Sequence, residues 1–150
     1  MSPVDNTYQI TVLMGAPGAG KSTWVKNNHG SEYIYTVDGI RVNRDIDLDE
    51  YMYTQRRRAI KAVEGGLCLI ADGTHTISTH RAVWLNLAKR LQLTTRIIAF
   101  VTPLSDLLAV QEMRLHPAPN AIVRKHHHRM HGALQLIKKE SWDNIEIIKR

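Results

Sequence analysis

The sequence has 150 residues, of which 43% are hydrophobic, and its formal net charge is +6 at pH 7. This length and apolar content predict one folded domain over residues 1–150 and exclude a chain that is disordered throughout. No apolar run approaches the length of a membrane span, the first residues lack a signal-peptide pattern, and one cysteine allows no internal disulfide, so we expect a cytoplasmic protein.

The first predicted element is an apolar strand over residues 8–14, and a glycine-rich loop follows it directly. The loop fits the pattern G-x-x-x-x-G-K-[ST] at every fixed position. A helix over residues 22–28 begins within it, so backbone N–H groups and the helix N-terminus would surround a polyphosphate. The pattern therefore predicts binding of ATP or another nucleoside triphosphate. The predicted phosphate-binding residues are Gly15, Ala16, Pro17, Gly18, Ala19, Gly20, Lys21, Ser22 and Thr23.

Two side chains of this loop have specific predicted roles. The ammonium group of Lys21 would contact the β- and γ-phosphates, and the hydroxyl group of Ser22 would bind Mg²⁺. The alternative is a glycine-rich turn that binds nothing. The apolar strand in front of the loop and the Lys-Ser pair in register argue against that alternative.

A second strand, over residues 34–37, ends at Asp38, and a polar loop leads from it to a helix over residues 49–64. Asp38 and Arg41 form an Asp-x-x-Arg pair just after the strand. The carboxylate could accept the proton of an attacking hydroxyl group, and the guanidinium could hold a phosphate of the acceptor through two hydrogen bonds. A helix-capping aspartate beside a solvated arginine fits the same spacing, so both interpretations stay open.

The third predicted strand, over residues 67–71, is continuously apolar and ends at Asp72. We expect Cys68, which lies inside it, to belong to the core. Asp72 could lie near the Mg²⁺ ion or hydrogen-bond the acceptor, whereas the alternative is an ordinary Asp-Gly turn. Because ligands bind at the carboxyl ends of parallel strands, the functional interpretation of Asp72 is favoured.

Strands and helices continue to alternate in the second half of the chain. The alternation predicts an α/β fold of the P-loop NTPase type, a three-layer sandwich with a central parallel sheet and helices on both faces. A proline-containing loop over residues 116–120 suggests a helical lid at about residues 114–130. The remaining predicted helices span residues 78–91, 103–114 and 121–130, and the remaining strands span residues 96–101 and 145–148.

Basic residues flank the predicted lid. Arg114 precedes the loop, where closure could bring its guanidinium onto the transferred phosphate. Arg124, Lys125 and Arg129 are each expected to be solvated. Residues 126–128 are three consecutive histidines, which point in different directions on a helix, so we predict no metal site there. The arginines at positions 56–58 are expected to form a solvated helical face, with contact to nucleic acid as the alternative.

Together these residues resemble the kinase domain of bacteriophage-type polynucleotide 5′-kinases, which heal the ends of nucleic acids. The resemblance implies that Asp38 is the general base on the 5′-hydroxyl group, that Arg41 contacts a phosphate of the acceptor strand, and that Arg114 contacts the donor phosphates and the transition state. Gly73 departs from the pattern, because a hydroxyl residue commonly follows the aspartate in that family. The resemblance rests on the glycine-rich loop followed by Trp24, the Asp38–Arg41 pair, residues 51–54 before a basic run, Asp72 and Arg114.

We therefore expect an ATP-dependent kinase that phosphorylates a 5′-hydroxyl end of DNA or RNA. The positive charge fits this acceptor, since basic side chains attract a phosphodiester backbone. The alternative is a small-molecule kinase that acts on a nucleoside, a nucleotide or a sugar. A nucleotide-hydrolysing switch or assembly ATPase is a third possibility, but the sequence offers no clear residue to position the attacking water. No oligomeric state is predicted.

Overall fold

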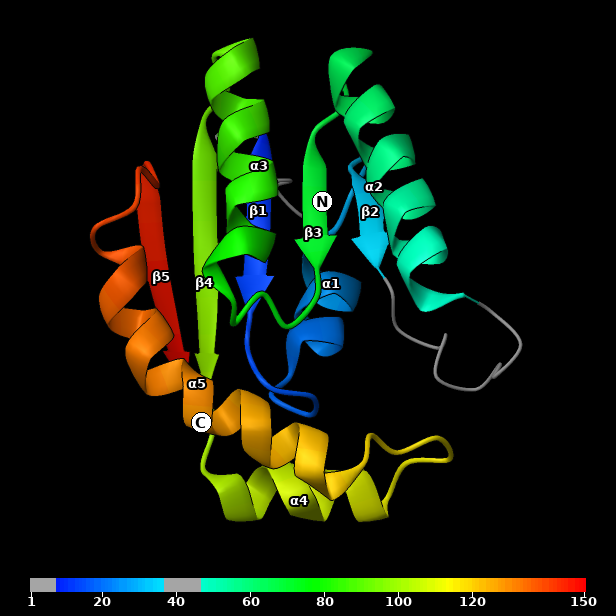
Figure 1. Cartoon of the computed structure of the whole chain (residues 1–150), viewed down its shortest axis with the longest axis vertical. Helices are drawn as coiled ribbons and strands as arrows, with labels where there is room; N and C mark the ends of the chain where they lie inside the picture. The colour runs from blue at the N-terminus through cyan, green and yellow to red at the C-terminus, as the bar shows by residue number, and fades with distance from the viewer. Residues whose placement is uncertain (1–7, 37–46) are drawn as a thin grey trace.

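The computed structural model describes residues 8–36 and 47–150, in which five parallel strands form one sheet with helices packed around it (Figure 1). All four neighbouring pairs of strands are parallel. This arrangement confirms the predicted α/β fold. From one edge of the sheet to the other, the strands are β2 (Tyr33–Thr36), β3 (Leu69–Asp72), β1 (Ile10–Met14), β4 (Thr95–Val101) and β5 (Asn144–Lys149).

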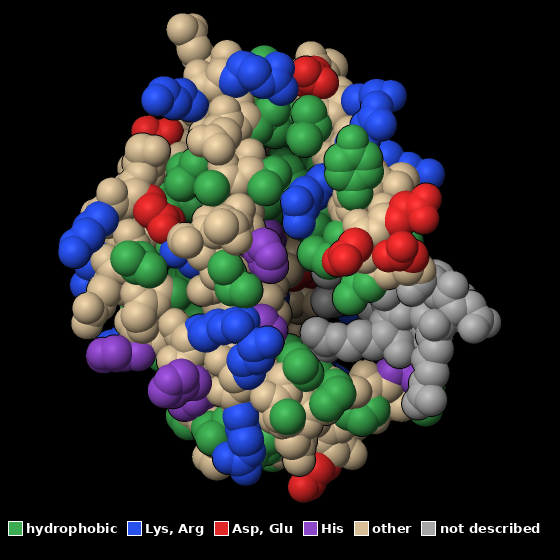
Figure 2. Space-filling view, viewed as in Figure 1, with side chains coloured by type: hydrophobic (Ala, Val, Ile, Leu, Met, Phe, Trp, Pro, Cys, Tyr) green, Lys and Arg blue, Asp and Glu red, His purple; other side chains and the backbone are tan. Residues whose placement is uncertain are grey.

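Helices connect the strands because parallel neighbours must start from the same edge of the sheet. In Figure 1, α2, α3 and α5 lie on one face, α1 lies on the other, and α4 crosses below the carboxyl edge of the sheet. The space-filling view of the first face shows a hollow near its middle (Figure 2). The helices are α1 (Lys21–Asn28), α2 (Leu48–Glu64), α3 (Ser78–Leu91), α4 (Leu104–Glu112) and α5 (Asn120–Ile137).

The apolar core is divided between the two faces of the sheet. All five residues of β1 are buried, and Val12 and Leu13 belong to different clusters because successive side chains of a strand point to opposite faces. Trp84 of α3 belongs to the cluster of Val12, and Phe100 of β4 to that of Leu13. A central strand packed on both sides fixes the position at which the glycine-rich loop leaves the sheet.

Some predicted boundaries and one predicted environment differ from the structure. Helix α5 continues to Ile137 rather than ending at Met130, because Ala133 and Ile137 extend its buried stripe at helical spacing. Strand β3 begins at Leu69 rather than at residue 67, since Gly66 turns the chain with a φ angle of 98°. Cys68 is consequently half-buried instead of lying in the core. The start of β1 and the end of α4 also differ from the prediction by two residues, and the remaining predicted boundaries agree within one residue.

The predicted pair Asp38 and Arg41 lies outside the described residues, so its roles stay predictions. Helix α2 begins after Asp47, whose carboxylate accepts hydrogen bonds from the N–H groups of Asp49 and Glu50. In the described part of the chain, no helix combines the length and the hydropathy that crossing a lipid bilayer requires.

Candidate active site

The glycine-rich loop joins the end of β1 to the start of α1, and its glycines are required by the backbone and by neighbouring side chains. Gly18 and Gly20 have φ angles of 93° and 103°, which L side chains rarely adopt. A Cβ atom at Gly18 would lie 2.8 Å from Nε2 of Gln111, and one at Gly20 would lie 2.7 Å from Cζ of Arg150. The loop therefore has its sharp turns at the positions where its neighbours approach closest.

Lys21 is the first residue of α1 and is 7% exposed. Its ammonium group donates hydrogen bonds to the carbonyl oxygens of Gly15 at 2.7 Å and Ala16 at 2.9 Å. No side chain caps α1, and the N–H groups of a first helical turn have no partners within the helix. The ammonium group and the positive end of the helix dipole thus share one position, an arrangement that favours phosphate.

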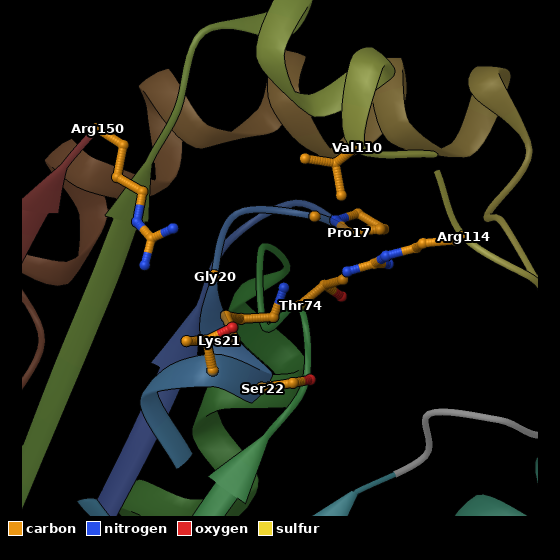
Figure 3. Close-up of a pocket in the computed structure, with 10 residues that line it drawn as sticks. Pro17, Gly20, Lys21, Ser22, Thr74, Val110, Arg114 and Arg150 are labelled. Atoms are coloured by element: carbon orange, nitrogen blue, oxygen red, sulfur yellow. The ribbon is translucent and has the colours of Figure 1, made fainter. Parts of the chain in front are cut away.

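A pocket of about 190 Å³ opens over this loop. Besides the loop, Thr74 after β3, Val110 of α4, Arg114 and Arg150 line it. In Figure 3 the side chains of Arg114 and Arg150 extend toward the loop from opposite sides. Arg114 therefore lies where its predicted role requires, and that role stays a prediction. Arg150 was missed, because only the pairing of β5 with β4 brings it to the loop, with its N–H group bonded to the carbonyl oxygen of Val101 at 3.0 Å.

The side chain of Gln111 connects the loop to the segment that precedes α5. Gln111 is 3% exposed. Its Nε2 atom donates a hydrogen bond to the carbonyl oxygen of Pro17 at 3.0 Å. Its Oε1 atom accepts a hydrogen bond from the N–H group of Ala118 at 2.9 Å. Sequence reasoning missed this contact, since a lone glutamine in an amphipathic helix carries no recognisable signal.

His75 fixes the segment between β3 and α3 against the loop. Its Nδ1 atom donates to the carbonyl oxygen of Leu13 at 2.8 Å, and its Nε2 atom accepts the indole N–H group of Trp84 at 3.0 Å. Burial lowers the pKa of His75 to about 4, although backbone hydrogen bonds to Leu13 and Gly73 raise it. The ring is therefore neutral at pH 7, with its proton on Nδ1. The carbonyl oxygen of Thr74 in turn accepts the N–H group of Gly15 at 2.9 Å.

The ring of His75 also explains the departure at Gly73. A Cβ atom at Gly73 would lie 2.9 Å from the imidazole, so the position has no room for a larger residue. Thr74, one residue later, brings a hydroxyl side chain to the pocket instead. Asp72 is the last residue of β3 and is 4% exposed. It lies at the carboxyl edge of the sheet as predicted, while its function stays a prediction.

These features define the class of protein: a phosphate-binding loop at the carboxyl edge of a parallel sheet is the fold of P-loop kinases and related nucleotide-binding proteins. The family model AAA_33, described as an AAA domain, matches residues 10–137. The chain belongs to this family. Comparison with curated proteins gave no match.

Solved structures share the fold at low sequence identity. Deoxyadenosine kinase from M. mycoides with bound dATP is 14% identical with a TM-score of 0.56, and the match covers 93% of this chain and 90% of that one. A chain of the PezAT toxin–antitoxin system of Streptococcus pneumoniae is 16% identical with a TM-score of 0.60, over 94% of this chain and 68% of that one.

A chain of the AvrRxo1-ORF1:AvrRxo1-ORF2 complex with ATP is 13% identical with a TM-score of 0.66, over 93% of this chain and 54% of that one. Our chain thus spans about half the length of that relative. At such identities the likeness shows the fold alone. The expected resemblance is therefore confirmed for the P-loop kinase fold, whereas the narrower likeness to polynucleotide kinases finds no support in these three structures.

Proposed function

We propose that the protein transfers the γ-phosphate of ATP, or of another nucleoside triphosphate, to a hydroxyl group of a small molecule such as a nucleoside, a nucleotide or a sugar. The observation that carries this proposal is the pocket in which Lys21, the N-terminus of α1 and Arg114 come together. The shared fold with deoxyadenosine kinase, over nearly the whole of both chains, supports a small acceptor.

Positively charged side chains would bind the phosphates of the donor nucleotide and stabilise the group that is transferred. Lys21 would leave the carbonyl oxygens of its own loop and contact the β- and γ-phosphates. Arg114 would stabilise the charge that develops on the transferred phosphoryl group. The turns of the loop at Gly18 and Gly20 are already formed, so the change on nucleotide binding would centre on the side chain of Lys21.

The residues beside the loop fit a Mg²⁺ ion, which prefers oxygen ligands. Ser22, in the first turn of α1, offers a hydroxyl group to the pocket, and Asp72 offers a carboxylate at the end of the adjacent strand β3. When bound there, the ion would neutralise charge on the β- and γ-phosphates.

For the acceptor half we retain Asp38 as the proposed general base. A carboxylate that follows β2 would meet an acceptor at the same sheet edge as the loop, since parallel strands end at one edge. Arg41 would hold the acceptor, and Asp72 would bind either the ion or the acceptor. Exchanging each aspartate for asparagine separates the base from the binder, because asparagine keeps the shape but accepts no proton.

A second candidate is the polynucleotide 5′-hydroxyl kinase expected from the sequence. The net charge of +6 favours it, since a small acceptor does not require such an excess. Transfer to an oligonucleotide would then fall steeply as salt is added. Transfer to a small neutral acceptor would not.

One labelling experiment distinguishes the candidates. The full chain is incubated with Mg²⁺, γ-labelled ATP and a panel of acceptors: nucleosides, 3′- and 5′-mononucleotides, sugars, sugar phosphates, 5′-hydroxyl oligonucleotides of DNA and RNA, and water alone. Label on any small acceptor supports the proposal, whereas label on oligonucleotides alone supports the second candidate. Release of inorganic phosphate with no labelled acceptor contradicts both. Lys21→Ala is the negative control.

A further inference from the structure

Three half-buried basic side chains from three helices meet on the face of the sheet that carries α2, α3 and α5. They are Arg56 of α2, His80 of α3 and Arg129 of α5, and we call them the basic cluster. Arg56 and Arg129 were expected to be solvated. Their neighbours Arg57, Arg58, Arg124 and Lys125 are more exposed, as predicted.

Helix α5 brings Arg129 toward the start of α3. The hydroxyl group of Thr76 and Nδ1 of His126 are hydrogen-bonded at 2.7 Å, which joins α5 to the segment just before α3. Arg129 follows His126 by three residues and so lies on the same face of its helix. His80 lies in the first turn of α3, close after Thr76. The contact therefore places Arg129 beside His80.

Helix α2 brings Arg56 to the same place from the opposite flank of α3 (Figure 1). Arg56 lies near the hydroxyl group of Tyr35, because its guanidinium is among the influences that lower the pKa of that hydroxyl, which burial raises. The ring of Tyr35 meets that of Trp84 edge-on, with centroids 5.0 Å apart. Trp84 is one helical turn after His80, so the two share a face of α3. His80 consequently lies between the two arginines.

The cluster has a positive potential. Burial lowers the pKa of His80, and the charges of Arg56, Arg129 and Arg81 lower it further. Arg81 is neutralised by Glu140, at 2.8 Å. Within residues 8–36 and 47–150, neither Arg56 nor Arg129 forms an ion pair with an acidic side chain.

Helix α3 adds to this potential, because it starts without a side-chain cap and without an acidic residue in its first turn. Figure 2 shows Lys, Arg and His side chains gathered around the hollow on this face. Like charges repel one another when they are held together, and in the described part of the chain no acidic side chain pairs with either arginine. An anion bound among them would relieve that repulsion.

The cluster is adjacent to the catalytic pocket along one short segment. Thr74 lines the pocket over the phosphate-binding loop, and Thr76, two residues later, contacts α5 beside Arg129. We infer that the basic cluster binds a phosphate group of the acceptor, so that the acceptor is a phosphate ester such as a nucleotide or a sugar phosphate. This inference rests on the proposed kinase function.

A binding experiment tests the cluster without relying on activity. Inorganic phosphate is titrated into the full chain, with Mg²⁺ and a non-hydrolysable ATP analogue saturating the loop. The ring signals of His80 are followed by NMR and assigned with His80→Gln. We expect the His80 signals to move and the pKa of His80 to rise, because a bound anion favours the imidazolium ion.

Arg129→Gln should weaken phosphate binding at least tenfold, whereas Arg124→Gln, an exposed arginine on the same helix, should leave it unchanged. Arg129 is the better first variant because Arg56 lies near the buried ring of Tyr35, so a change there could also disturb the core. Equal phosphate affinity in the wild type and in Arg129→Gln, or His80 signals that do not move, would overturn the inference.

Paired acceptors test the consequence for the reaction. Each nucleoside is compared with its 3′- and 5′-nucleotides, and each sugar with its phosphate. We expect the phosphorylated member to have a KM at least tenfold lower, and Arg129→Gln to remove the difference while Arg58→Gln keeps it. Equal use of both members overturns the inference and leaves the kinase proposal intact.

The other outcomes also separate the two proposals. No transfer to any acceptor, with phosphate still bound at His80, contradicts the kinase proposal and supports the anion site. Transfer only to oligonucleotides, lost in Arg129→Gln, overturns the small phosphate ester as acceptor, because the cluster then binds the phosphodiester backbone.

Discussion

The side-chain amide of Gln111 donates a hydrogen bond to the carbonyl oxygen of Pro17 at 3.0 Å, so α4 is tied to the phosphate-binding loop. The same amide accepts the N–H group of Ala118. Arg114 lies between these two anchored points of the chain, residues 111 and 118. The shape of the loop and the position of Arg114 therefore depend on one buried side chain.

Gln111→Leu should destabilise the protein and weaken nucleotide binding together. The variant leaves the carbonyl of Pro17 and the N–H group of Ala118 without their partner, which costs about 1–3 kcal/mol for a buried group. Urea unfolding and titration with an ATP analogue measure the two effects. Glu112→Gln, at the exposed neighbouring position, is the control. Unchanged nucleotide affinity in a destabilised Gln111→Leu protein would limit the role of Gln111 to folding.

Lys21→Ala should abolish phosphoryl transfer and leave the fold intact. The ammonium group of Lys21 donates to the carbonyl oxygens of Gly15 and Ala16, and its charge is needed when the phosphates are bound. Lys26→Ala, which removes an exposed charge from the last turn of the same helix, should keep full activity. Circular dichroism and the labelling assay provide the readings. Normal turnover in a folded Lys21→Ala protein would exclude the loop from the mechanism.

Arg114→Ala should lower kcat far more than it lowers nucleotide affinity. An arginine that stabilises the transition state of phosphoryl transfer contributes roughly 10³–10⁵-fold to the rate. Steady-state kinetics and equilibrium nucleotide binding separate the two effects, with Arg124→Ala as the matched control. A loss of binding with kcat preserved would instead make Arg114 a ground-state contact.

Asp38→Asn should lower turnover by roughly 10²–10⁴-fold, the usual effect of losing a general base, with little change in ATP affinity. Asp72→Asn should instead raise the concentration of Mg²⁺, or of the acceptor, that is needed to reach half of the maximal rate. Initial rates at varied Mg²⁺ and acceptor concentrations distinguish the variants. If Asp38→Asn weakens ATP binding and spares turnover, the base lies elsewhere.

His75 should make the protein less stable in mild acid. Burial lowers its pKa from the ordinary value of 6.5, which applies to the unfolded chain, to about 4 in the folded protein, so the unfolded chain binds the proton more readily. The contribution of His75 is complete above pH 6.5 and is lost as the pH falls toward 4. Between pH 7 and pH 5 the free energy of unfolding should decrease by about 2 kcal/mol from this group.

Urea unfolding at pH 7, 6 and 5 measures this effect. His75→Gln should be less stable at pH 7 but less sensitive to pH, because the buried group no longer titrates. His116→Gln, at an exposed position, should keep the wild-type profile. Parallel profiles for the wild type and His75→Gln would show that another group causes any loss in acid.

The phosphate-binding loop, the alternation of strands and helices, and the class of the fold could all be predicted from the amino-acid sequence. Each of these is encoded locally: the glycines and Lys21 are within nine residues of one another, and hydrophobic periodicity is a property of short windows. The boundaries that proved wrong, at Leu69 and Ile137, depend on pairing and packing with distant segments. The proposed roles of Asp38, Arg41 and Arg114 stay predictions.

Which polar side chains contact one another could not be predicted from the sequence, because these contacts depend on the packing of distant segments. Gln111, His75 and Arg150 have unremarkable neighbours in sequence, and the sheet brings each of them to the loop. Of three consecutive arginines, only Arg56 is half-buried, because successive residues of a helix point about 100° apart and one direction faces the sheet. The residue type alone gives the charge of a side chain, whereas the group that the side chain contacts depends on the packing of the whole chain.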